Sequence, residues 1–172
     1  QIPQFTKKQA IVLDALSHNS SITSQGYFTG GTALSSFYLN HRESEDIDIF
    51  SRNRWDSQQV FQILSGIVGE NGTITARVVD PVFIYMLHFP DGEELKVDFA
   101  QYPYPQIEDS GQRIGDLKVD SLIDIATNKL QTIPQRQEVK DFVDLYFLLK
   151  KFTFWDLRQG VAEKFRMDIE PL

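Results

Sequence analysis

Hydrophobic residues recur along the chain with two different spacings, and each spacing predicts a type of element. Intervals of three and four residues place apolar side chains on one face of a helix, whereas alternation places them on one face of a strand. Helices and strands alternate through the first hundred residues, and the pattern becomes helical beyond the Pro- and Tyr-containing segment 102–105. The predicted elements are a helix after Thr6, a strand at 27–29, a helix at 32–40, a strand at 46–50, a helix after Asp56, β-rich sequence from 73 to 89, a strand at 95–100, and helices at 121–131, 137–151 and 156–165.

The order of these elements predicts the fold class. Helix, strand, helix, strand, helix, hairpin and then helices fits an α+β domain with a small mixed sheet, flanking helices and a C-terminal helical segment. Residues 82–99 form the predicted hairpin, because the Pro-Asp-Gly sequence at 90–92 is a strong turn signal between two strand-like runs. At 172 residues the chain suits one compact unit, with a core at residues 1–110 and a helical region at residues 111–172 packed on it.

The helix predicted at 137–151 has two contrasting sides. Lys140, Asp141 and Asp144 are spaced so that they crowd one side. This charged side is interpreted either as a solvated, salt-bridged face or as part of a site, and the sequence leaves both open. The apolar residues are expected to be well buried and to supply the core; they are Phe142, Val143, Leu145, Tyr146, Phe147, Leu148 and Leu149.

Composition and charge exclude several classes of protein. The formal net charge of -7 argues against a basic nucleic-acid-binding module, so any nucleic-acid partner would have to meet a local basic surface or a metal ion. The chain has no cysteine, which excludes disulfides, thiolate zinc sites and a cysteine nucleophile. No apolar run approaches the roughly 20 residues of a membrane span, and no basic-then-apolar leader is visible. We therefore expect a cytoplasmic protein with no membrane partner.

Two adjacent glycines, Gly30 and Gly31, lie where a predicted strand turns into a predicted helix. Glycine lets the backbone approach a ligand closely, and the first N–H groups of a helix can bind phosphate. A plain tight turn would use the same residues. Taken alone, the glycine pair does not decide between these two interpretations.

Two aspartates, Asp46 and Asp48, follow on a predicted strand and project to the same face. Their carboxylates repel each other unless a cation or solvent compensates. Magnesium fits this arrangement, since it prefers one or two carboxylates together with phosphate oxygens and water. An exposed strand face is the alternative interpretation.

A third carboxylate, Asp98, lies with Lys96 on one face of the strand predicted at 95–100. If this strand pairs beside the one at 46–50, Asp98 can join the two earlier aspartates. Three carboxylates can hold two divalent ions, which would stabilise the attacking and leaving oxygens in phosphoryl transfer. Asp98 could also act as the general base on an attacking hydroxyl.

These residues form part of a longer series of motifs across most of the chain, roughly residues 26–150. The series is Gly30-Gly31-Thr32-Ala33-Leu34, His41-Arg42-x-Ser44-x-Asp46-Ile47-Asp48-Ile49-Phe50, Lys96-Val97-Asp98-Phe99, Asp124-Ile125-Ala126-x-x-Lys129, Arg136 and Lys140-Asp141-x-x-Asp144-Leu145-Tyr146. It resembles the nucleotidyltransferases of the AbiEii/AbiGii toxin type, which belong to the DNA polymerase β-like nucleotidyltransferase superfamily. The superfamily is marked by a Gly-Gly or Gly-Ser pair, a helix, an Asp-x-Asp sequence and a later third Asp.

The resemblance implies a role for each matching residue. The implied nucleotide-binding residues are Gly30, Gly31, Thr32, Ser44 and Lys129, with Lys129 facing the phosphates. The implied catalytic residues are Asp46, Asp48, Asp98, Lys129 and Asp144, of which the first three would bind metal. The expected cofactor is Mg²⁺, as two ions, with Mn²⁺ as an alternative.

The main functional prediction is therefore a magnesium-dependent nucleotidyltransferase. It would move a nucleoside monophosphate from a nucleoside triphosphate to an acceptor hydroxyl, at the 3′ end of a tRNA or on a protein. The resemblance implies the toxin of a toxin–antitoxin or phage-defence pair, with a cognate antitoxin. One alternative is a non-catalytic nucleotide-binding or interaction domain on the same fold, against which the three aspartates and Lys129 argue. Another is an unrelated α+β protein whose acids are surface charges.

Overall fold

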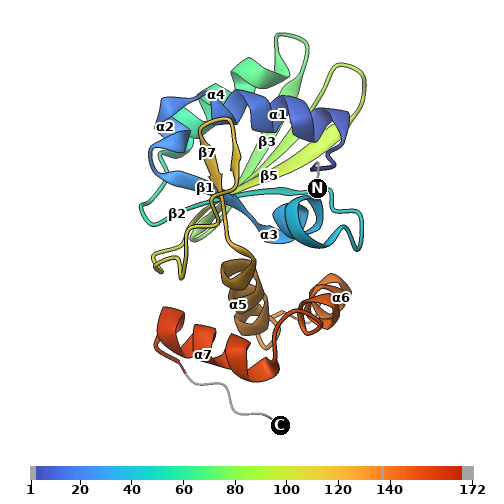
Figure 1. Cartoon of the computed structure of the whole chain (residues 1–172). Coiled ribbons are helices and arrows are strands. Elements are labelled where there is room, and N and C mark those ends of the chain that lie inside the picture. Colours follow the sequence, from blue (N-terminus) through green and yellow to red (C-terminus); the bar gives the residue numbers. More distant parts are fainter. Residues whose placement is uncertain (1–2, 137, 168–172) are drawn as a thin grey trace.

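A mixed β-sheet with helices on both faces forms the body of the protein (Figure 1). The computed structural model describes residues 3–136 and 138–167. In this part of the chain the strand order is β3-β4-β5-β2-β1-β7-β6. The strands are β1 (Gly26–Thr29), β2 (Ile47–Ser51), β3 (Thr73–Val79), β4 (Val82–His88), β5 (Glu94–Gln101), β6 (Arg113–Ile114) and β7 (Leu117–Val119). The helices are α1 (Lys7–Ser17), α2 (Ser20–Thr23), α3 (Gly30–Ala33), the π-helix η1 (Leu34–Leu39), α4 (Ser57–Val68), α5 (Leu122–Thr132), α6 (Val139–Leu148) and α7 (Phe154–Phe165).

The central strand β2 pairs antiparallel with β1 and parallel with β5. The predicted hairpin is confirmed, because β4 and β5 pair antiparallel on either side of the Pro-Asp-Gly turn. The mixed sheet and flanking helices confirm the predicted fold class. Beyond the prediction, β7 joins the sheet by parallel pairing with β1, and β6 then pairs antiparallel with β7.

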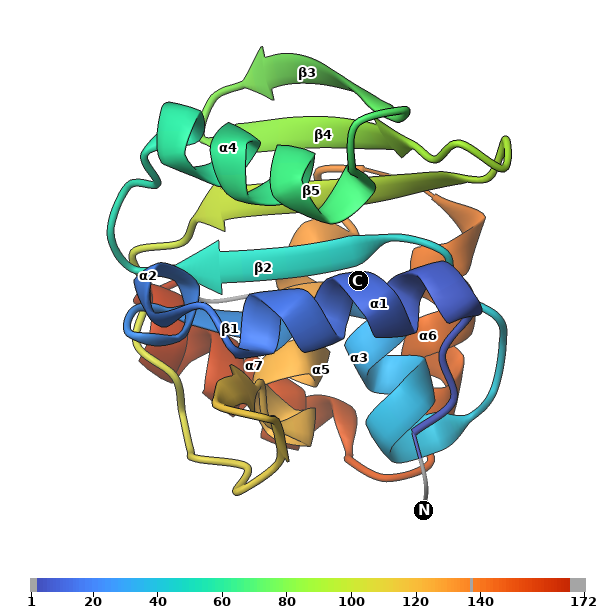
Figure 2. The same ribbon diagram turned by 90° about the horizontal axis from the view of Figure 1, so that it is seen from above.

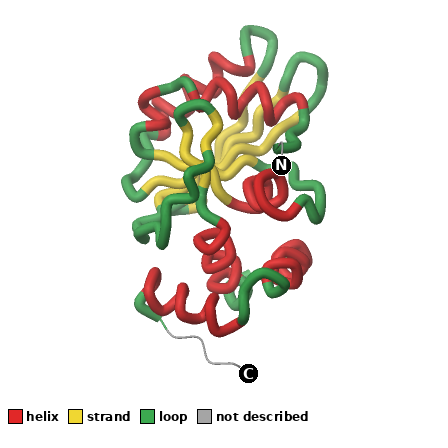
Figure 3. Tube along the Cα trace, in the orientation of Figure 1, coloured by secondary structure: helices red, strands yellow, loops and turns green. Residues whose placement is uncertain are grey.

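Two helical layers cover the sheet, as the colouring in Figure 3 makes plain. Helices α1 and α4 lie over one face of the sheet, whereas α3, η1 and α5 lie over the other (Figures 1 and 2). Helices α6 and α7 lie on either side of α5, and both contact it. None of the helices in the described part of the chain is long and apolar enough to span a membrane.

Local sequence signals explain where several helices begin. The side chain of Thr6 accepts a hydrogen bond from the backbone N–H of Gln9, and the Gln9 side chain accepts from the backbone N–H of Thr6, which together form a capping box at the start of α1. Asp56 caps α4, accepting from two backbone N–H groups of its first turn. The helix predicted at 32–40 instead begins at Gly30, continues as a π-helix from Leu34 and ends at Asn40, whose φ is 47°.

The hydrophobic core follows from the alternation of the central strands. Ile47 and Ile49 of β2 are fully buried, as are Val97 and Phe99 of β5, and all four point away from the aspartates of the same strands. Leu16 of α1 also lies in this cluster. Burial of these apolar faces fixes the register of β2 and β5, since a one-residue slip would turn their aspartates into the core.

The predicted burial of the apolar residues at 137–151 is confirmed for Leu148 but is wrong for Phe142, Tyr146 and Leu149. Asp141, Asp144 and Leu148 are fully buried, whereas Phe142 is 50% and Tyr146 is 61% exposed. The helix is therefore turned with its aspartates toward the body of the protein. The reason is that basic side chains pair with these two aspartates. Lys129 of α5 contacts both carboxylates, and Arg42 of the segment that follows η1 contacts Asp144.

Candidate active site

A cleft lies between the face of the sheet that carries the aspartates and the helices α5 and α6. The predicted site residues that line it are Gly30, Gly31, Ser44, Asp46, Asp48, Asp98 and Lys129. The remaining two, Thr32 and Asp144, are buried beside it. Residues that the sequence analysis did not assign to the site also line the cleft, among them Phe50, Lys96, Tyr102, Arg136, Glu138 and Lys140.

The parallel pairing of β2 with β5 brings the three aspartates together. Asp48 lies directly opposite Asp98 in the register of the two strands. Asp46 lies two residues before Asp48, so it projects to the same face. The arrangement that the sequence analysis made conditional on strand pairing is therefore present in the structure.

Negative charge is crowded where Asp46, Asp48 and Asp98 line the cleft, and we call this surface the acidic floor. Burial raises the pKa of Asp48 to about 6, and the neighbouring carboxylates of Asp98 and Asp46 add to the increase. Burial also raises the pKa of Asp98, although Lys96 opposes this change. A raised pKa means that the ionised carboxylates are held together at a cost in free energy.

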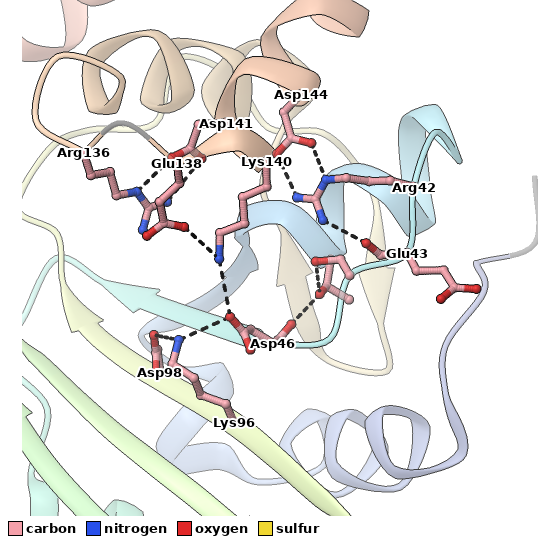
Figure 4. Close-up of polar contacts among 12 residues, drawn as sticks. Arg42, Glu43, Asp46, Lys96, Asp98, Arg136, Glu138, Lys140, Asp141 and Asp144 are labelled. Carbon is pink, nitrogen blue, oxygen red and sulfur yellow. Dashed lines mark hydrogen bonds and ion pairs between the residues drawn. The ribbon is translucent and has the colours of Figure 1, made fainter.

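Lys96 supplies a cation at the centre of this acidic floor (Figure 4). Its ammonium nitrogen lies 2.8 Å from Asp98 Oδ2 and 3.2 Å from Asp46 Oδ2. A second ammonium group, that of Lys140 on α6, lies 4.0 Å from Asp46 Oδ2 and 3.1 Å from Glu138 Oε2. The sequence signal for Lys96 was its position two residues before Asp98, which places both side chains on one face of β5.

The glycine pair makes room for two charged side chains. Gly30 has a φ of +78°, and a Cβ atom there would lie 2.0 Å from Asp48 Oδ2. A Cβ on Gly31 would lie 2.5 Å from Arg42 Nη2. Both glycines therefore permit close approach of side chains from β2 and from the segment after η1, which a larger residue would displace.

Thr32 and Ser44 hold the segment that leads into β2. The Thr32 hydroxyl donates to the backbone carbonyl of Asp46, and its oxygen also lies 3.0 Å from Ser44 Oγ. The carbonyl oxygen of Ser44 accepts from Gln9 Nε2 at 2.8 Å. These contacts tie α3 and α1 to the start of β2, and so they position Asp46.

Asp144 is the centre of a group of basic side chains rather than part of the cleft lining. Its carboxylate contacts His41 Nε2 at 2.7 Å, Arg42 Nε at 2.6 Å and Lys129 Nζ at 2.8 Å. Burial alone would raise the pKa of Asp144, but hydrogen bonds from His41 and Arg42 and the charge of Lys129 outweigh it and hold the pKa well below its usual range. The ionised carboxylate therefore stabilises the contact between α6, α5 and the segment after η1.

Lys129 lies between two carboxylates of α6. Its ammonium nitrogen is 2.7 Å from Asp141 Oδ1, in addition to its contact with Asp144, and the residue is only 6% exposed. Asp141 also accepts from Arg136 Nε at 3.1 Å. In this structure Lys129 joins α5 to α6 at the edge of the cleft.

A second buried polar group lies behind the cleft and was not anticipated from the sequence. Lys164 of α7 and Asp124 of α5 are both fully buried and form an ion pair of 2.7 Å. Asp120 accepts from Thr29 Oγ1 at 2.8 Å, and burial raises its pKa to about 6. These residues connect β1, the start of α5 and α7 beneath the site.

The acidic floor has one further property that bears on ligand binding. The Oδ1 atom of Asp98 is buried and has no hydrogen-bond partner within the described residues. As the side chains stand, no three acidic or histidine residues in the described ranges are arranged to hold a metal ion. The ammonium group of Lys96 lies between the carboxylates of Asp46 and Asp98.

Two sequence comparisons relate the chain to known proteins. A family model described as the nucleotidyl transferase AbiEii toxin of a type IV toxin–antitoxin system matches residues 12–170. An uncharacterized protein of Aquifex aeolicus is 33% identical over 139 residues. That match covers 77% of this chain and 61% of the relative, so the chain spans less than two thirds of the relative's length.

Solved structures share the fold. The crystal structure of JHP933 from Helicobacter pylori matches with a TM-score of 0.63 at 22% identity, covering 91% of this chain and 68% of that one. The solution structure of the antibiotic-resistance factor ANT(2″)-Ia matches with a TM-score of 0.58 at 14% identity, covering 94% and 93% of the two chains. At these identities the likeness concerns the arrangement of strands and helices.

Proposed function

The chain belongs to the AbiEii nucleotidyltransferase toxin family, and from this premise we propose that its cleft is the active site of a magnesium-dependent nucleotidyltransferase. The reaction moves a nucleoside monophosphate from a nucleoside triphosphate to an acceptor hydroxyl. The acceptor hydroxyl loses its proton to a general base, for which Asp98 is the candidate. Its oxygen forms a bond to the α-phosphorus, the bond from that phosphorus to the β-phosphate oxygen breaks, and pyrophosphate leaves.

One observation carries this proposal. Asp46, Asp48 and Asp98 share one sheet face, beside a glycine with positive φ that opens the backbone against Asp48. Carboxylates crowded in this way are unfavourable for stability, as the raised pKa of Asp48 indicates. Carboxylates that lower the stability of the fold are expected at functional sites, where their negative charge takes part in binding or catalysis.

The residues of the floor fit a divalent cation in their chemistry. Asp46, Asp48 and Asp98 are oxygen donors of the kind that Mg²⁺ prefers, and the buried Oδ1 atom of Asp98 has no hydrogen-bond partner within the described residues. Bound there, Mg²⁺ (or Mn²⁺) would neutralise charge on the α-phosphate and on the leaving pyrophosphate. The ammonium group of Lys96 would have to leave its position between Asp46 and Asp98, because a divalent metal ion and an ammonium group cannot occupy the same place.

Cations at the mouth of the cleft are suited to hold a triphosphate. Arg42 lies against Gly31, and both Arg136 and Lys140 line the cleft with side chains about half exposed. Their positive charges would orient the β- and γ-phosphates. They would also offset, at the mouth of the cleft, the net negative charge of the chain. Positioning and charge neutralisation, rather than a covalent nucleophile, would provide the catalysis.

The biological role that we propose follows from the family. The protein acts as the toxin of a type IV toxin–antitoxin system with a cognate antitoxin, in the cytoplasm and in phage defence. The acceptor is the 3′ end of a tRNA or a protein hydroxyl. Either acceptor would reach the cleft past Arg136 and Lys140, which is a local basic surface of the kind that an acidic chain needs for an RNA partner.

A labelling experiment tests the proposal and identifies the acceptor. The protein is incubated with each α-labelled nucleoside triphosphate, Mg²⁺, and either total RNA or total protein. We expect label on one acceptor class with at least one triphosphate, and no label with EDTA or with Asp48→Asn. Absence of label in every combination, or equal labelling by Asp48→Asn, would show that this cleft is not the proposed active site.

A further inference from the structure

Lys96 contacts two carboxylates of the acidic floor at once. Its ammonium nitrogen lies 2.8 Å from Asp98 Oδ2 and 3.2 Å from Asp46 Oδ2 (Figure 4). The side chain lines the cleft and is 31% exposed, so the ammonium group can be reached from the cleft. A divalent ion held by the same two carboxylates would have to lie where this ammonium group lies.

One ammonium group neutralises the acidic floor only in part. Three carboxylates meet there, and Lys96 supplies a single positive charge. The ammonium group of Lys140 lies 4.0 Å from Asp46 Oδ2 but only 3.1 Å from Glu138 Oε2, with which it pairs. The buried Oδ1 atom of Asp98 has no hydrogen-bond partner within the described residues. The acidic floor is therefore arranged for more positive charge than Lys96 supplies.

The backbone of Lys96 lies at the end of the acidic floor that carries the glycine pair. The parallel register of β2 and β5 places Lys96 beside Asp46, at the start of β2. Strand β1 runs antiparallel to β2 and ends on the same side, where Gly30 and Gly31 follow it. Arg42 lies against Gly31 there. The lysine is thus anchored where the proposed site holds the β- and γ-phosphates, and the end of its side chain extends over the acidic floor.

A lysine side chain is suited to change partners at such a place. Its ammonium group is carried on a flexible stem of four carbons and has three hydrogens to donate. Carboxylate and phosphate oxygens both accept charge-assisted hydrogen bonds from it. Rotation about the bonds of the stem moves the ammonium group while the backbone of β5 stays in place. Lys96 can therefore exchange a carboxylate for a phosphate without a change in the sheet.

From these contacts we infer that Lys96 is an exchangeable counter-ion, which leaves the carboxylates for a phosphate when a metal ion and a triphosphate bind together. It opposes the binding of Mg²⁺ alone, because the ion must displace an ammonium group from two carboxylates. A triphosphate supplies a new partner for that group, so the ion and the nucleotide bind as a coupled pair. The inference rests on the proposed function, since the phosphate that receives Lys96 belongs to the proposed substrate.

Titration of Mn²⁺ without nucleotide tests the displacement, with the free ion measured by electron paramagnetic resonance and the fold of each variant checked by circular dichroism. Lys96→Met removes the charge, and we expect it to bind Mn²⁺ on the order of ten- to hundredfold more tightly than the wild type. Lys96→Arg keeps the charge and should bind as weakly as the wild type. Lys140→Met is the matched control, because it removes a positive charge near Asp46 but not from between the carboxylates. It should raise the affinity by no more than about fivefold.

Calorimetric titration of each ribonucleoside triphosphate in saturating Mg²⁺ tests where the ammonium group goes. We expect Lys96→Met to bind a triphosphate about tenfold more weakly than the wild type, because one charge-assisted contact with phosphate is lost. One substitution then has two effects of opposite sign, tighter binding of the ion alone and weaker binding of the nucleotide with the ion. A side chain that only supported the fold would not separate these two affinities.

Two results would overturn the inference. The first is an Mn²⁺ affinity that is unchanged in Lys96→Met, or that Lys140→Met or Lys96→Arg raises equally. The second is triphosphate binding as tight in Lys96→Met as in the wild type, which would show that Lys96 excludes the ion without transferring to phosphate. Failure of the proposed function has a different signature: no triphosphate binds to either protein, and the transfer to phosphate is refuted with it, while the Mn²⁺ titration still shows whether Lys96 and the ion compete for one place.

Discussion

Two buried carboxylates in this protein are expected to respond in opposite ways to the same substitution. Asp48 lies among other carboxylates, and burial with those neighbours raises its pKa from 3.8 to about 6. Asp144 lies among the side chains of His41, Arg42 and Lys129, and its pKa is held well below the usual range. Replacing each by asparagine removes the charge with little change of shape, so the change in stability reports the electrostatic environment of each site.

The sign for Asp48 follows from proton linkage. Because its folded-state pKa is raised, ionisation destabilises the native state as the pH rises from about 4 to about 6. A difference of about two pKa units corresponds to about 3 kcal/mol. In metal-free buffer, Asp48→Asn should therefore match the wild type at pH 4 and exceed its free energy of unfolding by about 3 kcal/mol at pH 7.5. For a chain of this length that is an increase in Tm of roughly 6–12 °C.

Asp144→Asn is the matched comparison with the opposite sign. Because the pKa of Asp144 is lowered in the folded state, its ionised carboxylate stabilises the native state at pH values above the ordinary aspartate pKa. This contribution is lost as the pH falls below about 4. Removing it leaves buried cations without their partner, at a cost of about 3–5 kcal/mol at pH 7.5. The assay is urea denaturation followed by tryptophan fluorescence from pH 4 to 8, with EDTA present. If Asp48→Asn is no more stable than the wild type at pH 7.5, the reasoning about crowded charge is refuted.

Three other substitutions probe the site and its support. Gly30→Ala should lower Tm by several degrees and impair Mg²⁺-dependent nucleotide binding, because the new Cβ would overlap Asp48; unchanged binding in a calorimetric titration would count against it. Lys96→Met should cost about 2 kcal/mol in EDTA and less in Mg²⁺, as denaturation with and without the ion would show; equal losses would argue against a shared cation position. Lys164→Met should cost about 3–5 kcal/mol by leaving the buried Asp124 carboxylate without its ion-pair partner, measurable as a lower urea midpoint, and a neutral result would contradict the ion pair.

The central strands could be predicted from sequence because their pattern is local. Alternation in β2 and β5 separates aspartates from buried residues within five to eight residues of chain. The conditional step was the pairing of the two strands, which depends on contacts about fifty residues apart. Strands β6 and β7 were not predicted, since segments of two and three residues carry too little pattern to be recognised.

The orientation of α6 could not be predicted for a different reason. Its sequence has a charged side and an apolar side, and burial of the apolar side is the usual outcome. The partners that reverse this outcome are His41, Arg42 and Lys129, which are distant in sequence from Asp144. The same long-range contacts explain why Asp144, expected to be a polar site residue, lies buried beside the cleft instead of lining it.

Isothermal titration of nucleoside triphosphates tests the central claim most directly, namely that the aspartate floor and the glycine pair form a metal-dependent nucleotide site. The wild type and Asp48→Asn are titrated with each triphosphate in Mg²⁺ and in EDTA. We predict that the wild type binds at least one triphosphate in Mg²⁺ alone, and that Asp48→Asn, although more stable, binds none. Equal binding in EDTA, equal binding by Asp48→Asn, or no binding of any triphosphate by the wild type would contradict the account.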